Sequence, residues 1–284
     1  MSKFIFSGFA DEISPDFDEQ LKLLNELGIK YLELRGAYGK NVSEFSDEML
    51  DRLSEKLEKS GIGVSAIGSP VGKYEITEDY SIQLERFCRI IDIAKKMKTR
   101  YIRIFSYFMK PCDFEKYKDE VIRRLFGFVK IAENEDIVLL HENEKDIFGE
   151  NAENCKYIFD NIKSPNLKGI FDPANFVQCG VDTLKAFELL KEHIVYMHIK
   201  DALPNGEVVP AGMGIGRLPE IFGRLNADGY EGFVSLEPHL GFFNGLGELE
   251  QGEIKQKTAS DADKFKLAYR KTEEIIRSVQ NEKA

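Results

Sequence analysis

Short apolar segments rich in β-branched and aromatic residues recur along the chain and alternate with longer segments of helical period. The short segments lie at residues 4–9, 30–35, 62–68, 100–106, 137–142, 167–172, 195–200 and 232–237. Several are apolar almost throughout, which is typical of strands in a parallel sheet that is covered on both faces. We therefore predict eight buried strands.

The longer segments place apolar residues at positions i, i+3, i+4 and i+7, the pattern of an amphipathic helix. In the first of them, the apolar face consists of Phe17, Leu21, Leu24 and Leu27. We expect Ser14 to be its N-cap, Pro15 to be its first residue and Gly28 to end it. The chain thus alternates between strand and helix.

Eight strand–helix units, repeated at intervals of roughly 26 to 38 residues, fit a single (β/α)8 barrel, or TIM barrel, of about 250 residues. An open, doubly wound sheet is the competing fold because it uses the same units. No linker interrupts the composition, so residues 1–284 are interpreted as one domain. The long segment at about 238–261 is interpreted as a lid, with surface irregularity or a subunit contact as the alternative.

Acidic and imidazole side chains stand where four successive strands end: Glu142, Asp172, His198 and Glu237. The carboxyl ends of the strands form the active-site rim of a barrel, so these side chains are expected to converge. Carboxylates held so close together would repel one another unless a cation balanced them. Oxygen ligands with one imidazole suit Mn²⁺, Mg²⁺ or Co²⁺, with Zn²⁺ as a further option. Taken singly, each residue also has a structural alternative: a surface acid, a turn, a core histidine or a strand end.

Other residues near the strand ends have two interpretations each. Glu33 could bind a substrate hydroxyl or form a structural salt bridge with Arg35. Lys200 could bind a hydroxyl or phosphate, or be a solvated loop residue. His141 is expected to point away from Glu142 and to pack against a helix, because successive strand residues face opposite sides.

A glycine-rich segment at 211–219 (AGMGIGRLP) precedes a predicted helix. Its backbone N–H groups, together with Arg217, could hold a phosphate. A flexible loop is the equal alternative, because a short run of alternating glycines is a weak signal.

Composition narrows the class of protein. The chain of 284 residues carries 39 basic and 49 acidic residues, a net charge of −10. This charge argues against nucleic acid or an anionic membrane as a partner, since both require a basic surface.

No apolar run approaches the roughly 20 residues that span a bilayer. The first residues lack the features of a signal peptide, and the 4 cysteines are scattered and expected to be reduced packing residues. We expect a cytoplasmic protein.

Several short motifs occur together in a fixed order: FADEIS (9–14), LELRG (32–36), ENE (142–144), DPAN (172–175), HIKD (198–201) and SLEPH (235–239). In this order they resemble the xylose-isomerase-like sugar phosphate isomerase/epimerase superfamily over essentially the whole chain. Within it, the chain is similar to ketose 3-epimerases, hydroxypyruvate isomerases and inosose dehydratases.

The resemblance implies a TIM barrel that holds one divalent ion, usually manganese, through two glutamates, an aspartate and a histidine. These fall on the same four strand-end residues, and Glu142 and Glu237 become the acid/base pair. It also implies a small sugar or sugar phosphate as the substrate, and homo-oligomers are common among such proteins. Asn175 stands where many relatives have an imidazole that touches the substrate, and Glu144 where His is frequent, so no particular ketose preference transfers.

The function expected from the resemblance is metal-dependent isomerisation or epimerisation through an enediolate. A lyase that dehydrates a polyol ketone would use the same groups, and a non-catalytic sugar-binding barrel would keep the pocket alone. An endonuclease for abasic DNA shares this fold, but the 4 histidines and the charge of −10 argue against it.

Overall fold

Eight parallel strands form the centre of the computed structural model, which describes residues 2–240 and 261–281. They are β1 (Lys3–Gly8), β2 (Tyr31–Leu34), β5 (Gly63–Ile67), β6 (Tyr101–Ile104), β7 (Val138–Glu142), β8 (Leu167–Phe171), β9 (Ile194–Ile199) and β12 (Glu231–Leu236). Their order in the sheet is β1-β12-β9-β8-β7-β6-β5-β2. The end strands β1 and β2 also contact each other, so the sheet curls into a barrel. This confirms the TIM barrel over the open sheet.

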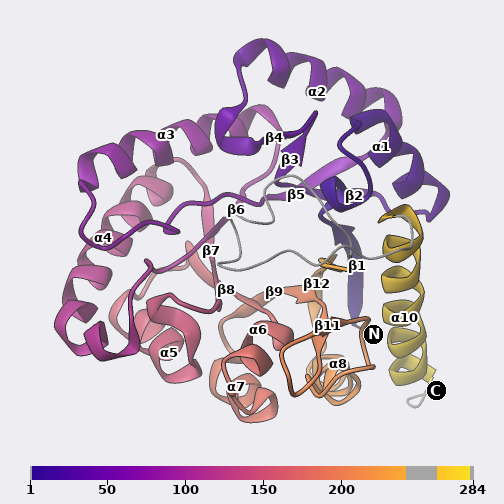
Figure 1. Ribbon diagram of the computed structural model, residues 1–284. Coiled ribbons are helices and arrows are strands. Elements are labelled where there is room, and N and C mark those ends of the chain that lie inside the picture. The colour runs from indigo at the N-terminus through magenta and orange to yellow at the C-terminus, as the bar shows by residue number, and fades with distance from the viewer. Residues whose placement is uncertain (1, 241–260, 282–284) are drawn as a thin grey trace.

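Helices surround the ring of strands (Figure 1). They are α1 (Phe17–Glu26), α2 (Asp47–Ser60), α3 (Tyr80–Lys96), α4 (Phe114–Asn134), α5 (Ala152–Asn161), α6 (Pro173–Gln178), α7 (Thr183–Leu190), α8 (Leu218–Ala227) and α10 (Asp261–Asn281). Short hairpins pair β3 (Gly36–Ala37) with β4 (Lys40–Asn41), and β10 (Asp201–Ala202) with β11 (Val208–Val209). Both hairpins follow barrel strands at their carboxyl ends.

The start of α1 differs from the expectation. Asp16, not Ser14, is the N-cap, and its side chain accepts the N–H of Asp18. Ser14 instead accepts the N–H of Asp16 and so forms the turn before the helix. A carboxylate that reaches the free N–H groups of the first turn also interacts favourably with the helix dipole. Gly28 follows the helix at φ +72°, as expected of a helix end.

Side chains alternate between the two faces of the strands, and this alternation builds two cores. Leu139 of β7 faces the helices, whereas Val138 and Leu140 face the barrel interior with Tyr196. In β9, Met197 and Ile199 face outward on the same principle. The apolar layer between strands and helices is the large core, and the interior is smaller and partly polar.

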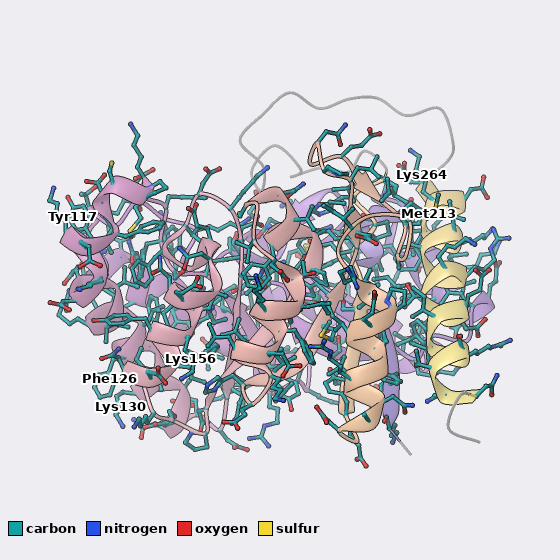
Figure 2. All side chains as sticks on the ribbon, turned by 90° about the horizontal axis from the view of Figure 1, so that it is seen from below. Tyr117, Phe126, Lys130, Lys156, Met213 and Lys264 are labelled. Atoms are coloured by element: carbon teal, nitrogen blue, oxygen red, sulfur yellow. The ribbon has the colours of Figure 1, made fainter. Side chains whose placement is uncertain are left out.

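The two ends of the barrel are distinguished in the side view (Figure 2). Tyr117, near the start of α4, lies at the same end as Met213, whereas Phe126 and Lys130, further along α4, lie towards the other end. Because each helix begins after a strand has ended, the end with Met213 is the carboxyl rim of the strands.

Three further expectations concern the chain as a whole. Most of the predicted lid at 238–261 lies outside the described residues. All 4 cysteines are free, but Cys88 and Cys112 are exposed, so only Cys155 is a buried packing residue. Among the described helices, none has the length and apolar character to cross a bilayer.

Candidate metal centre

The four strand-end residues face the site because each continues the row of inward-facing side chains of its strand. Glu142 lies two residues after Leu140 on β7, and His198 lies two residues after Tyr196 on β9. Glu237 likewise follows Ser235 on β12. Since the side-chain period of a strand is two residues, each polar group faces the barrel interior just above its last inward core residue.

The structure brings all four side chains together at the carboxyl rim. One potential ligand atom from each of Glu142, Asp172, His198 and Glu237 lies within 4.8 Å of the others. Nδ1 of His198 lies 2.8 Å from Oε1 of Glu142 and 3.3 Å from Oε2 of Glu237. All four side chains are buried. Three buried carboxylates and an imidazole nitrogen at this spacing fit one small divalent ion.

Asp172 shows most clearly how the local sequence prepares a ligand atom. It ends β8 and caps α6, and its Oδ1 accepts the N–H of Asn175 at 3.0 Å. Pro173 at the first helical position fixes the turn. The second oxygen, Oδ2, is buried and lies 3.0 Å from the ammonium of Lys200. A buried carboxylate oxygen needs a cation beside it, and here the lysine supplies that charge.

His198 is oriented by Glu33, which changes the role expected of that residue. Nε2 of His198 lies 3.0 Å from Oε2 of Glu33, on the side of the ring opposite to the cluster. The same oxygen accepts hydrogen bonds from the hydroxyls of Tyr196 (3.0 Å) and Ser235 (2.7 Å). Arg35 pairs with Asp11, Glu12 and Glu237, and a contact of Glu33 with a substrate hydroxyl stays a prediction. A carboxylate behind a histidine fixes the ring so that the other nitrogen can face an ion.

Replacing Glu33 with glutamine is expected to weaken Mn²⁺ binding by about 10- to 100-fold, because His198 loses the charged partner that orients it. Calorimetric titration measures this affinity. Ser235→Ala is the matched control, since it removes another contact of Glu33 without touching His198. An unchanged affinity in Glu33→Gln would contradict the orienting role.

Two arginines hold the second oxygens of the two glutamates, a role that was not predicted from the sequence. Arg103 donates to Oε2 of Glu142 at 3.2 Å, and Arg35 donates to Oε1 of Glu237 at 3.3 Å. Both guanidinium groups pack over the ring of Phe9, at 5.0 and 4.2 Å from its centroid. The signal was present in the sequence: Arg103 stands at an inward position of the apolar β6, and Arg35 at the next inward position after Glu33 at the end of β2.

The charges around the cluster set the protonation of its members. Burial raises the pKa of Glu142, but His198 and Arg103 outweigh it and bring the pKa to about 2. Burial also opposes ionisation of Glu237, yet Lys200, His239 and His198 hold its pKa well below its usual range. Burial and the neighbouring glutamates raise the pKa of Asp172 to about 6, against the effect of Lys200. Both glutamates are therefore ionised at neutral pH.

Lys200 and Asn175 lie within this network and not in solvent. Lys200 is 3% exposed, so the alternative of a solvated loop lysine is wrong. Its ammonium lies between Asp172 and Glu237. Asn175 donates from Nδ2 to the carbonyl of Asn143 at 2.9 Å and to Oε1 of Glu142 at 3.4 Å. Both side chains border the proposed ligands directly.

The glycine-rich segment has a different role from the one expected. The N–H groups of Gly212, Gly214 and Gly216 donate to the carboxylate of Asp201 at 2.8 to 3.0 Å. The expectation that they hold a phosphate is wrong, because these donors already bind a buried side chain. A Cβ at Gly214 would lie 2.3 Å from the carbonyl oxygen of Ala202, so the loop needs glycine there.

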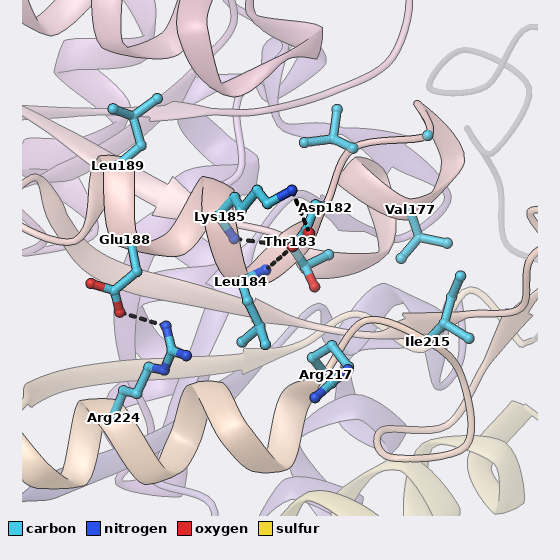
Figure 3. Close-up of a pocket in the computed structure, with 12 residues that line it drawn as sticks. Val177, Asp182, Thr183, Leu184, Lys185, Glu188, Leu189, Ile215, Arg217 and Arg224 are labelled. Carbon is cyan, nitrogen blue, oxygen red and sulfur yellow. Dashed lines mark hydrogen bonds and ion pairs between the residues drawn. The ribbon is translucent and has the colours of Figure 1, made fainter.

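Arg217 stands apart from the cluster. It lies at the start of α8, at the edge of a groove of about 1040 Å³ on the outer side of the barrel, between α7 and α8 (Figure 3). Its guanidinium pairs with Glu220 and is half exposed. This groove is thus separate from the buried cluster of Glu142, Asp172, His198 and Glu237.

His141 points away from Glu142, as the alternation predicted. Its ring makes an edge contact with Phe159 of α5, with centroids 6.1 Å apart. Burial lowers the pKa of His141 to about 4, although Glu142 opposes the shift. The imidazole is therefore neutral at physiological pH and belongs to the packing between strand and helix.

This buried histidine makes the stability of the protein depend on pH. The unfolded chain takes up a proton near pH 6.5, whereas folded His141 does so only near pH 4. The corresponding stability is present above pH 6.5 and is lost as the pH falls to 4, at most about 3 kcal/mol. Between pH 6.5 and pH 4, the free energy of unfolding is expected to fall less in His141→Leu than in the wild type. Urea titration at several pH values measures this free energy. Parallel curves for the two proteins would contradict this.

A second group, Glu12, Glu237 and His239, also brings potential ligand atoms within 4.8 Å of one another. Here Arg35 pairs with Glu12 at 3.1 Å and with Glu237 at 3.3 Å. Nε2 of His239 lies 3.1 Å from Oε1 of Glu237, and the carboxylates raise the pKa of His239 to about 9 against the effect of burial. Protein cations already balance this group, so we assign no ion to it.

No curated protein sequence matches the chain. Among solved structures, "IOLI protein with a binding zinc atom" is similar at a TM-score of 0.78, with 16% identity over 97% of this chain and 99% of that one. An L-ribulose 3-epimerase gives 0.75, with 16% identity over 99% and 97%. A probable 3-DHS dehydratase, AsbF, from Bacillus anthracis gives 0.72, with 18% identity over 95% and 98%. These identities establish a shared fold.

The family profile described as "Xylose isomerase-like TIM barrel" matches residues 21–252. This range includes seven of the eight barrel strands and all four residues of the cluster. The resemblance seen in the motifs is thereby confirmed. The chain belongs to the xylose isomerase-like TIM-barrel family.

Proposed function

We propose that the protein is a divalent-metal-dependent isomerase or epimerase of a small sugar or sugar phosphate. The observation that carries the proposal is the convergence of Glu142, Asp172, His198 and Glu237 at the carboxyl rim, with ligand atoms within 4.8 Å of one another. The epimerases among similar structures support the substrate class. Manganese is the proposed ion. Zinc, which is named in a similar structure, is an alternative, and so are magnesium and cobalt.

The four residues of the cluster would hold the ion. When bound, it would act as a Lewis acid that polarises the substrate carbonyl and balances the negative charge of an enediolate. Glu142 and Glu237 are ionised and lie at the cluster, so each is proposed to remove or return the proton on the carbon beside the carbonyl. Arg103 and Arg35 hold the second oxygen of each glutamate and so fix its direction.

The outcome of the reaction depends on how many carboxylates act. If one glutamate removes the proton and the other returns it on the opposite face, the carbon is inverted and the sugar is epimerised. If one glutamate returns the proton to the neighbouring carbon, an aldose and a ketose are exchanged. Asn175 and Lys200 are proposed to contact substrate oxygens, because both border the ligands. Arg217 is not part of this proposal, since it lies outside the cluster.

A dehydratase is the second candidate, and the structural likeness to a probable 3-DHS dehydratase favours it specifically. It would begin with the same proton removal and then expel water from the next carbon. A non-catalytic sugar-binding barrel is the third candidate, although it does not explain why two ionised glutamates lie together at the cluster. We further propose that the protein acts in the cytoplasm on a small molecule, as a monomer or homo-oligomer.

The test is to incubate the Mn²⁺-loaded protein in D₂O with a panel of ketoses, their phosphates and an inosose. Deuterium at the carbon beside the carbonyl, followed by NMR, reports proton removal. A new sugar of unchanged mass apart from deuterium supports the isomerase or epimerase. Loss of water supports the dehydratase. Binding without deuterium incorporation in any compound would contradict the proposed enzyme and favour the sugar-binding barrel.

A further inference from the structure

The ammonium group of Lys200 shares its partners with the proposed ion. Nζ lies 3.0 Å from Oδ2 of Asp172 and 3.0 Å from Oε2 of Glu237. Oε2 of Glu237 also faces Nδ1 of His198 at 3.3 Å, so it points into the cluster. The lysine therefore contacts two of the four proposed ligands through oxygens that an ion would use.

Neither carboxylate has a spare oxygen that would let it serve both cations separately. Oδ1 of Asp172 is held by the backbone N–H of Asn175 at the start of α6. Oε1 of Glu237 lies 3.3 Å from Arg35 and 3.1 Å from His239. The oxygens that face the cluster are thus the same oxygens that face the ammonium.

We propose that Lys200 competes electrostatically with the divalent ion for Asp172 and Glu237 and thereby sets the metal affinity of the site. This inference rests on the proposed metal-dependent function. A positive charge about 3 Å from two ligand oxygens lowers the attraction that they exert on a second cation. The same charge compensates the buried carboxylates of the protein without metal, which would otherwise be costly to keep ionised. Lys200 therefore stabilises the metal-free protein at the expense of metal affinity.

The experiment compares the Mn²⁺ affinities of wild type, Lys200→Met and Lys200→Arg by calorimetric titration. Lys200→Met removes the charge and is expected to bind Mn²⁺ at least about tenfold more tightly. Lys200→Arg keeps the charge and is expected to stay within about threefold of wild type. Lys73→Met is the matched control, since Lys73 is also buried and pairs with Glu144 at 3.1 Å, away from the cluster. Its affinity is expected to remain that of wild type.

Thermal unfolding of the metal-free proteins gives a second readout that does not depend on activity. Lys200→Met is expected to melt roughly 5 °C or more below wild type without metal, because two buried carboxylates lose their partner. If this variant is unfolded without metal, it is refolded with Mn²⁺ and its affinity is obtained by competition with a chelator.

Two results would overturn the inference: unchanged or weaker Mn²⁺ binding in Lys200→Met, or equal tightening in Lys200→Arg, which would assign the effect to shape. A wild type that binds no divalent ion at millimolar concentration removes the proposed function together with the inference. A wild type that binds Mn²⁺ and turns over a sugar, with no gain in affinity in Lys200→Met, removes the inference alone.

Discussion

Replacing Glu142 with glutamine is expected to lower the rate of deuterium incorporation into a substrate by about 10²- to 10⁴-fold or more. The side chain keeps its size but loses the charge that would accept the proton. Its ionised state in the wild type is maintained by His198 and Arg103, which bring the pKa of Glu142 to about 2 against the effect of burial. The measurement is made at a saturating Mn²⁺ concentration, so that weaker metal binding does not account for the loss.

The chain supplies a matched control two residues away. Glu144 lies in the loop that follows β7 and pairs with Lys73. Glu144→Gln therefore removes a nearby carboxylate without changing the proposed ligands, and we expect a loss of less than about tenfold. If Glu142→Gln retained the wild-type rate of exchange, the acid/base role proposed for Glu142 would be wrong.

The second large effect concerns the ion itself. Treatment with a chelator is expected to lower the melting temperature and abolish turnover, and Mn²⁺ is expected to restore both. An ion present at a thousandfold excess over its dissociation constant stabilises the folded state by about 4.1 kcal/mol. For a protein of this size this corresponds to a shift of roughly 8 to 16 °C. Differential scanning calorimetry with and without Mn²⁺ measures the shift.

Asp172→Asn tests whether the shift comes from this cluster. Asparagine is as good an N-cap as aspartate, so α6 keeps its cap while the charged oxygen that faces the cluster is lost. Most of the stabilisation by Mn²⁺ should disappear. Asp182→Asn is the control, because Asp182 caps α7 in the same way without facing the cluster. Equal shifts in wild type and Asp172→Asn would place the ion elsewhere.

The sequence predicted the barrel and the side on which each functional group lies, because both depend on local patterns. A period of two residues along each strand places Glu142 inside and His141 outside, whatever the rest of the chain does. The same period places His198 above Tyr196 and Glu237 above Ser235. The same period places Arg103 on the inner side of β6 and Arg35 on the inner side at the end of β2, two residues after Glu33.

Partners that are distant in the sequence could not be assigned in this way. Glu33 and His198 are 165 residues apart, and Arg35 and Glu237 are 202 residues apart. Each pair meets because the sheet closes on itself with β1 next to both β12 and β2. Closure and register are set by the packing of the whole barrel, and no local pattern encodes them. The sequence therefore left Glu33 between a substrate contact and a salt bridge with Arg35, and it did not indicate the contact of Glu33 with His198.

The glycine-rich segment at 211–219 shows the same contrast between what the local sequence indicates and what the fold decides. Its glycines indicated backbone N–H donors near the start of a helix, and a phosphate was one possible acceptor. The folded chain brings Asp201, 15 residues before Gly216, to accept those N–H groups. Local sequence thus determined which residues face the rim and which donors the loop carries. The tertiary structure decided which charges meet, because ion pairs and hydrogen bonds are chosen by distance in space and not by separation along the chain.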